Sequence, residues 1–150
     1  MPPLYGRILM VLAILSCQAG FAQGPSDQAA ALQNTPNGKI ITAWYAAWEA
    51  KDWNALEQVM ASGFTFSSPL DDHITIKAVK ERCWPNAYNI KRFDVEKFVV
   101  NGDDAFVITK GWTTAGKLFR NTDYFRVKDG KIQAYECFFG PGVNFPNSGK

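Results

Sequence analysis

The chain has 150 residues, of which 47% are hydrophobic and 14% aromatic, and this length and composition predict one folded domain with a core and room for a lined cavity. Its net charge is +2, from 16 basic and 14 acidic side chains scattered in small mixed groups. Nucleic-acid binding requires a clustered basic face, which the sequence lacks, so we expect no nucleic-acid partner.

The N-terminal residues have the layout of a secretory signal peptide. Arg7 precedes an apolar run over residues 8–15, and the small residues Gly20 and Ala22 lie three and one positions before the expected cut. The run is too short to span a bilayer. We therefore expect residues 1–22 to be removed and the mature protein to be exported, either periplasmic or secreted, without membrane association.

Cysteine usage leaves two questions open. Lipidation at Cys17 is the alternative to cleavage, although Leu15 fits poorly in the box that precedes a lipidated cysteine. After cleavage, Cys83 and Cys137 are the remaining cysteines in an oxidising compartment. They can pair in a disulfide that joins the third helix to the last strand, or stay buried as free thiols.

Three helices are predicted in the first half of the chain, after a flexible lead-in over residues 23–34. Thr35 or Asn37 can cap the first, in which apolar residues including Trp44 and Trp48 recur at helical spacing. Two tryptophans four residues apart are often plain core, and a role in lining a pocket is the alternative.

The second helix is predicted over residues 53–61, with Asp52 as its cap and Gly63 as a left-handed stop. Thr75 caps the third helix. That helix is predicted to end near Trp84, because Pro85 disfavours helical geometry in the residue before it.

The strands follow a period of two. A short strand over residues 64–68 ends at Pro69, and the loop over 70–74 holds the single histidine, His73. Later strands cover residues 93–100 and 105–113, and the stretch 117–140 reads as a hairpin that turns at Asp129-Gly130. Helices followed by a meander predict an α+β fold, in which a curled sheet and its helices enclose a conical cavity.

This order of elements resembles the NTF2-like superfamily, specifically its SnoaL-like and ketosteroid-isomerase-like branch. The resemblance covers about residues 36–141, and its most specific motifs are AWEAKD at residues 47–52 and DYFRV at 123–127. It implies three N-terminal helices on a strongly curved antiparallel sheet of four to five strands, a domain over residues 35–141 followed by a tail over 142–150, and a homodimer formed through the outer face of the sheet.

The resemblance also implies roles for single residues. Asp123 matches the protonated aspartate of ketosteroid isomerases, whereas their helix tyrosine and their general base correspond here to Trp44 and Ser68. SnoaL-like cyclases often have a histidine on the last strand, where this chain has Tyr135. Proton shuttling of the isomerase kind therefore lacks two of its three groups.

Asp123 and His73 are the candidate catalytic residues. Burial of Asp123 would raise its pKa and let it donate a proton, while an acceptor role in holding the wall together is the alternative. His73 is the best spare base, and an exposed loop histidine is the alternative. The residues expected to line the ligand site are Trp44, Trp48, Phe66, Ser68, Trp84, Trp112, Asn121 and Tyr135.

Two functions fit these residues. The first is binding of a small hydrophobic, planar or polycyclic molecule, with cofactor-free proton transfer as in an isomerase, cyclase or hydratase if the protein is an enzyme. The second is a non-catalytic module that uses the same cavity or the open sheet face. No phosphate loop, nucleophile elbow or metal-ligand spacing is visible, so we expect neither a cofactor nor a metal.

Overall fold

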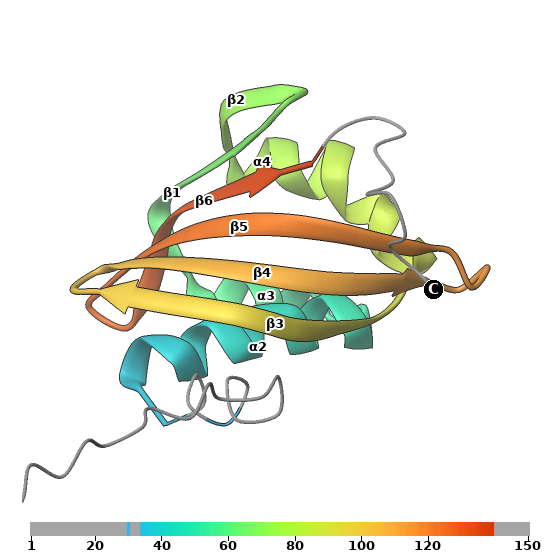
Figure 1. Cartoon of the computed structure of the whole chain (residues 1–150). Coiled ribbons are helices and arrows are strands. Elements are labelled where there is room, and N and C mark those ends of the chain that lie inside the picture. Colours follow the sequence, from blue (N-terminus) through green and yellow to red (C-terminus); the bar gives the residue numbers. More distant parts are fainter. Residues whose placement is uncertain (1–29, 31–33, 140–150) are drawn as a thin grey trace, which may run out of the picture.

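The computed structural model describes residues 30 and 34–139, and in this part of the chain helices cover one face of a single curved sheet (Figure 1). The expected signal peptide (1–22) and tail (142–150) lie outside the described residues, as does most of the expected lead-in. The helical elements are α2 (Pro36–Ala50), α3 (Trp53–Val59), α4 (Ile76–Ala78), the π-helix η1 (Val79–Cys83) and the 3-10 helix η2 (Trp84–Asn89). None of the described helices has the length and apolarity that crossing a membrane requires.

The predicted helix caps are confirmed. The Thr35 side chain accepts a hydrogen bond from the Gly38 N–H, and Asp52 and Thr75 cap α3 and α4 in the same way. The second helix ends earlier than predicted, at Val59, and Gly63 is not a left-handed stop because it lies inside a strand. Lys51 takes the left-handed conformation instead, with φ 58°, at the end of α2.

The third helical segment does not end at Trp84 as predicted. It widens into the π-helix η1 and then tightens into the 3-10 helix η2, which continues to Asn89. Pro85 is tolerated because it occupies the first turn of η2, where its missing N–H is not needed. The extra turn carries two asparagines toward the cavity described below.

The sheet has six strands in the order β2-β1-β6-β5-β4-β3, so the prediction of four to five strands was too low. The strand missed is β2, which occupies the predicted loop, and β1 begins earlier than predicted. β1 pairs parallel with β6, and every other neighbouring pair is antiparallel. The strands are β1 (Met60–Ser68), β2 (Asp71–Thr75), β3 (Ile90–Asn101), β4 (Asp104–Thr113), β5 (Leu118–Lys128) and β6 (Lys131–Phe138).

The predicted hairpin turn at Asp129-Gly130 is confirmed. Asp129 and Gly130 both have positive φ, at 53° and 71°, which is the geometry of a type I′ turn. Gly102 and Gly116 supply the positive φ of the two preceding turns.

The sheet curls without closing, and the helices pack on its concave side. Register shifts interrupt β3 between Ile90 and Arg92 and again between Val95 and Lys97, and such bulges increase the twist of a strand. The largest fully buried side chains include Trp44 of α2 and Phe125 of β5. The core therefore lies between α2 and the middle of the sheet.

Gly111 of β4 makes room for an aromatic ring on the concave face. It lies opposite Phe119 of β5, and a Cβ added to it would lie 2.0 Å from Cζ of Phe119. The Phe119 ring packs edge-on against Phe93 of β3, with centroids 6.0 Å apart. A side chain at position 111 would therefore push Phe119 away from its partner.

We predict that Gly111→Ala lowers the free energy of unfolding by about 1–3 kcal/mol, because the Phe119 ring must leave its packed position. Gly63→Ala is the control, since nothing lies within 4 Å of a Cβ there, and it should leave stability unchanged or raise it by less than about 1 kcal/mol. Urea unfolding of the two variants measures the difference. Equal stability of Gly111→Ala and wild type would contradict the packing argument.

Candidate ligand-binding site

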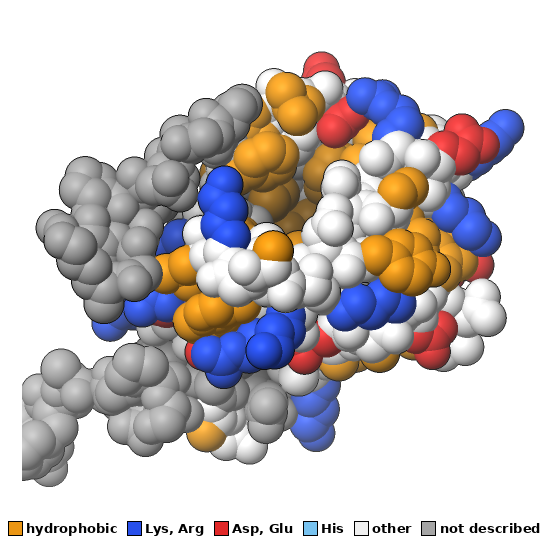
Figure 2. All heavy atoms as spheres, turned by 90° about the vertical axis from the view of Figure 1, so that its right-hand side faces the viewer, with side chains coloured by type: hydrophobic (Ala, Val, Ile, Leu, Met, Phe, Trp, Pro, Cys, Tyr) orange, Lys and Arg blue, Asp and Glu red, His pale blue; other side chains and the backbone are white. Residues whose placement is uncertain are grey.

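A cavity of about 630 Å³ opens at one end of the cone. Seen from that end, the molecule has a hollow whose walls are largely hydrophobic (Figure 2). Rings from α2, β1, β3, β5 and β6 line it, together with polar residues from η2. The size and the apolar walls are those of a small-molecule site.

Asp123 lies at the centre of a buried hydrogen-bond network beside this cavity. Its side chain is fully buried, at 0% exposure. Tyr45 Oη donates to Oδ2 at 2.7 Å, Tyr135 Oη donates to Oδ1 at 3.1 Å, and Thr109 Oγ1 donates to Oδ2 at 3.3 Å. Cys137 is the residue paired with Asp123 across β5 and β6.

Burial raises the pKa of Asp123 above its ordinary value, although hydrogen bonds from Tyr45, Cys137, Tyr135 and Thr109 act in the opposite direction. Burial also raises the pKa values of Tyr45 and Tyr135 well above their ordinary value, and the nearby Asp123 charge adds to the effect. Burial therefore disfavours the charged forms of the carboxyl group and of both phenols.

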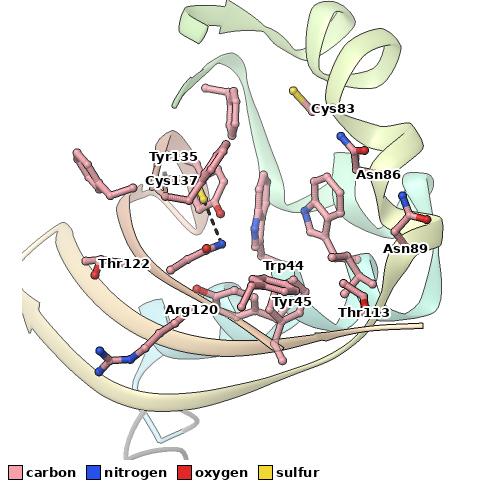
Figure 3. A pocket seen from close by; sticks show the side chains of 18 of the residues that line it. Trp44, Tyr45, Cys83, Asn86, Asn89, Thr113, Arg120, Thr122, Tyr135 and Cys137 are labelled. Carbon is pink, nitrogen blue, oxygen red and sulfur yellow. Dashed lines mark hydrogen bonds between the residues drawn. The ribbon is translucent and has the colours of Figure 1, made fainter. Parts of the chain in front are cut away.

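The carboxyl group reaches the cavity through its neighbours. Asp123 is not among the lining residues, whereas Tyr45, Tyr135 and Cys137 are (Figure 3). Protonation of Asp123 changes the hydrogen bonds that the hydroxyl groups of Tyr45 and Tyr135 can make. When the carboxyl group donates to one tyrosine oxygen, that hydroxyl can donate its own proton to a ligand in the cavity.

Tyr45 is the site residue that the sequence analysis missed. The resemblance to isomerases placed the helix group at Trp44, but the side chain that donates to Asp123 belongs to the next residue. The available signal was its spacing, since Tyr45 follows Ile41 by one helical turn and both are buried. A polar-tipped ring on an apolar helix face needs a buried partner.

Five of the predicted ligand-lining residues do line the cavity: Trp44, Trp48, Phe66, Asn121 and Tyr135. Trp44 packs on Tyr135 with centroids 4.7 Å apart and on Trp48 at 6.4 Å, so these rings form a wall and do not fill the space. Within the described residues the Trp44 indole N–H has no hydrogen-bond partner. It is a second donor available to a ligand.

Three predicted lining residues lie elsewhere. Ser68 is the last residue of β1 and lies beside the first residue of β2, with Ser68 Oγ 3.2 Å from Asp71 Oδ2. Trp84 packs between Trp48 and Trp53 in the core. Trp112 lies on the convex face, because alternation along β4 turns it away from the side that Gly111 faces. There the Arg92 guanidinium covers its ring, with Cζ of Arg92 3.9 Å from the ring centroid.

His73 does not reach the cavity either. Its side chain is 69% exposed in β2, and Nδ1 lies 2.5 Å from Oδ1 of Asp72. It is therefore not placed to act as a base on a ligand in the cone.

The cysteines are free thiols, not a disulfide, and both line the cavity. Burial, with a smaller effect from Asp71, raises the pKa of the Cys83 thiol to about 11, and burial raises that of Cys137 well above its ordinary value. Asn121 Nδ2 donates to Cys137 Sγ at 3.3 Å. Both thiols therefore stay protonated and behave as small apolar groups.

The described lining residues include no aspartate, glutamate or histidine. Arg120 is the one cation among them, and its side chain points away from the cavity (Figure 3). Its Nε lies 2.5 Å from Oε2 of Glu96. Residues 30 and 34–139 also contain no group of three metal-ligating side chains. The cavity thus presents neutral donors and acceptors.

Comparison with known proteins identifies the fold. The profile of the SnoaL-like domain family matches residues 41–135. No curated protein matches the chain.

Several solved structures are similar, at identities that establish the fold alone. An NTF2-like protein of unknown function from Cytophaga hutchinsonii is 19% identical, with 70% of this chain and 90% of that chain covered and a TM-score of 0.57. A Sinorhizobium meliloti protein described as a polyketide cyclase is 24% identical, with coverages of 66% and 93% and a TM-score of 0.57. TerC, co-crystallised with polyporic acid, is 19% identical, with coverages of 71% and 92% and a TM-score of 0.60.

We predict that Asp123 destabilises the fold as it ionises. Its folded-state pKa lies above the ordinary value of 3.8, so the folded state binds the proton more tightly and stability falls as pH rises through the interval between the two values. The free energy of unfolding of wild type minus that of Asp123→Asn should therefore drop between pH 4 and pH 7. Urea unfolding at both pH values measures it, and other titrating groups cancel in the difference. If the free energy of unfolding of wild type minus that of Asp123→Asn rises with pH, the prediction is wrong, and the hydrogen-bond donors stabilise the carboxylate form of Asp123.

Proposed function

Because the chain belongs to the SnoaL-like domain family of the NTF2-like superfamily, we propose that it binds a small, flat, largely apolar molecule that carries a carbonyl or hydroxyl oxygen. The single observation that carries this proposal is the aromatic cavity lined by Tyr45 and Tyr135, whose hydroxyl groups donate to the buried Asp123. The co-crystallisation of the related TerC with polyporic acid supports it.

The apolar walls suit a planar ligand. Trp44, Trp48, Phe93 and Phe119 offer ring faces and edges, on which an unsaturated ring system can stack. Most of such a ligand would be removed from water, which is favourable by about 25 cal/mol for each Å² of apolar surface. The polar groups then set its orientation.

The inner end recognises an oxygen atom. With Asp123 protonated, one tyrosine hydroxyl accepts from the carboxyl group and donates to the ligand, and the Trp44 N–H is a further donor. A ligand carbonyl at this end receives hydrogen bonds without any charged group entering the cavity. The protein thereby avoids burying a net charge.

Cofactor-free proton transfer is the second candidate function, and the raised pKa of Asp123 favours it. A protonated carboxyl group linked to the cavity by tyrosine hydroxyls can supply a proton, or polarise a carbonyl, as a general acid. The described lining residues contain no matching base. Abstraction of a proton from a ligand would therefore require a water molecule, and binding is the better-supported function.

We expect 2-naphthol to bind and to quench the fluorescence of the tryptophans that line the cavity. Tyr135→Phe should weaken binding about tenfold, because one hydrogen bond to the ligand oxygen is lost. Tyr88→Phe is the matched control, since Tyr88 is 66% exposed and does not line the cavity. No binding at millimolar 2-naphthol, or equal affinities for Tyr135→Phe and wild type, would contradict the proposed site.

The second candidate has its own readout. If Asp123 takes part in proton transfer, the wild-type protein should accelerate the exchange of the α-hydrogens of 2-tetralone for deuterium, which NMR can follow. The acceleration by Asp123→Asn should be at least about tenfold smaller than that by wild type. If 2-tetralone binds but its exchange is not accelerated, proton transfer is refuted and only the non-catalytic binding function remains.

The convex face of the sheet is the surface through which we propose that two copies associate. Val99, Phe106 and Tyr124 form a row across β3, β4 and β5, with Val99 64% and Phe106 51% exposed. The Phe106 and Tyr124 rings lie 5.2 Å apart. An exposed apolar row of this kind is a common feature of association surfaces.

We predict that Phe106→Glu converts a dimer into a monomer, because it places a charge in the centre of the buried patch. Leu70→Glu is the control, since Leu70 is 67% exposed in the β1–β2 turn. Light scattering after size-exclusion chromatography measures the mass, and 2-naphthol binding should survive both substitutions. A monomeric wild type would refute the proposed assembly.

A further inference from the structure

Two asparagines on η2 face the cavity from the wall opposite Tyr135 and Cys137 (Figure 3). Asn86 and Asn89 are three residues apart in a 3-10 helix, where side chains at i and i+3 eclipse one another. Their carboxamides therefore lie on one side of the helix. Both residues line the cavity.

The position of this pair is fixed by its surroundings. The Asn89 carbonyl accepts a hydrogen bond from the Thr114 N–H at 2.9 Å, which ties the end of η2 to the β4–β5 turn. Trp84, at the start of η2, is 8% exposed and packs on Trp48 and Trp53. The helix is thus held at both ends, and the two amides keep their places at the rim.

Neither carboxamide has a partner in the part of the chain that the structure describes. In the described residues, no hydrogen bond or ion pair is made by the side chain of Asn86 or of Asn89. By contrast, the Asn121 amide on the opposite wall is engaged with Cys137. The η2 pair consequently offers two N–H₂ donors and two carbonyl acceptors to whatever occupies the outer part of the cavity.

Resting on the function proposed above, we propose that Asn86 and Asn89 are specificity-determining residues that bind an uncharged hydroxyl group at the outer end of the ligand. A hydroxyl group both donates and accepts, and adjacent carboxamides satisfy both capacities at once. The ligand class is then a flat molecule with an oxygen at each end, one held by the tyrosines beside Asp123 and the other by the asparagines.

The charge of the site supports an uncharged group. No acidic side chain is among the described lining residues, so nothing there pairs with a cationic ligand. The Arg120 guanidinium is directed to Glu96, with which it forms an ion pair, and Glu96 also pairs with Lys110 Nζ at 2.8 Å. Recognition at the rim is left to neutral hydrogen bonds.

The test compares 2-naphthol, which has one hydroxyl group, with 2,6-dihydroxynaphthalene, which has one at each end. Wild type should bind the diol about tenfold more tightly, which corresponds to one additional hydrogen bond. In the double variant Asn86→Leu/Asn89→Leu, which conserves side-chain volume, the ratio of the two dissociation constants should fall to about one. Asn54→Leu on the exposed side of α3 is the matched control and should keep the wild-type ratio.

The outcomes separate this inference from the function on which it rests. If 2-naphthol binds but the diol binds no more tightly, or if the double variant keeps the tenfold ratio, the assignment of the asparagines is overturned and the binding function stands. If neither compound binds wild type, both are overturned. Retained 2-naphthol binding by the double variant, with loss of the ratio, supports the assignment and shows that the cavity is intact.

Discussion

Four elements of this fold are joined at one buried carboxyl group. Asp123 on β5 accepts hydrogen bonds from Tyr45 on α2, Thr109 on β4 and Tyr135 on β6. Burying a carboxyl group is costly unless its oxygens are hydrogen-bonded, and three donors from three elements meet that requirement. The bond from Tyr45 anchors α2 to the sheet, and Trp44 and Trp48 of the same helix form a wall of the cavity.

A cavity remains open beside this network because the aromatic rings pack on one another along its walls and do not fill it. Trp44 lies against Tyr135 and Phe64, and Trp48 lies against Trp84, so these large side chains satisfy their contacts along the walls. On the opposite side, Gly111 leaves space for the tip of the Phe119 ring. A ligand would thus meet surfaces that are already ordered, and binding would cost little side-chain entropy.

Local features of the fold were predictable from the sequence. Helix caps and hairpin turns depend on a few neighbouring residues, and Thr35, Asp52 and the Asp129-Gly130 turn all took the predicted roles. The burial of Asp123 was also predictable, because it is an acid among the apolar residues of a central strand.

Long-range features of the fold were not predictable from the sequence. The parallel pairing of β1 with β6 and the short edge strand β2 depend on partners far away in the chain. Trp112 was placed in the cavity although it is one residue from the inward-facing Gly111, and in a strand one residue changes the face. Tyr45 was overlooked for a similar reason, since its partner lies 78 residues away.

An open sheet has two free edges, and both edges here discourage other chains from adding to them. β2 is only five residues long, begins with Asp71 and Asp72, and is bent by the positive φ of His73. β3, the far edge, carries two bulges and has exposed cations such as Lys91 and Lys97. Short, kinked and charged edges resist strand addition, so the protein can keep an unclosed, strongly curved sheet without a tendency to form fibrils.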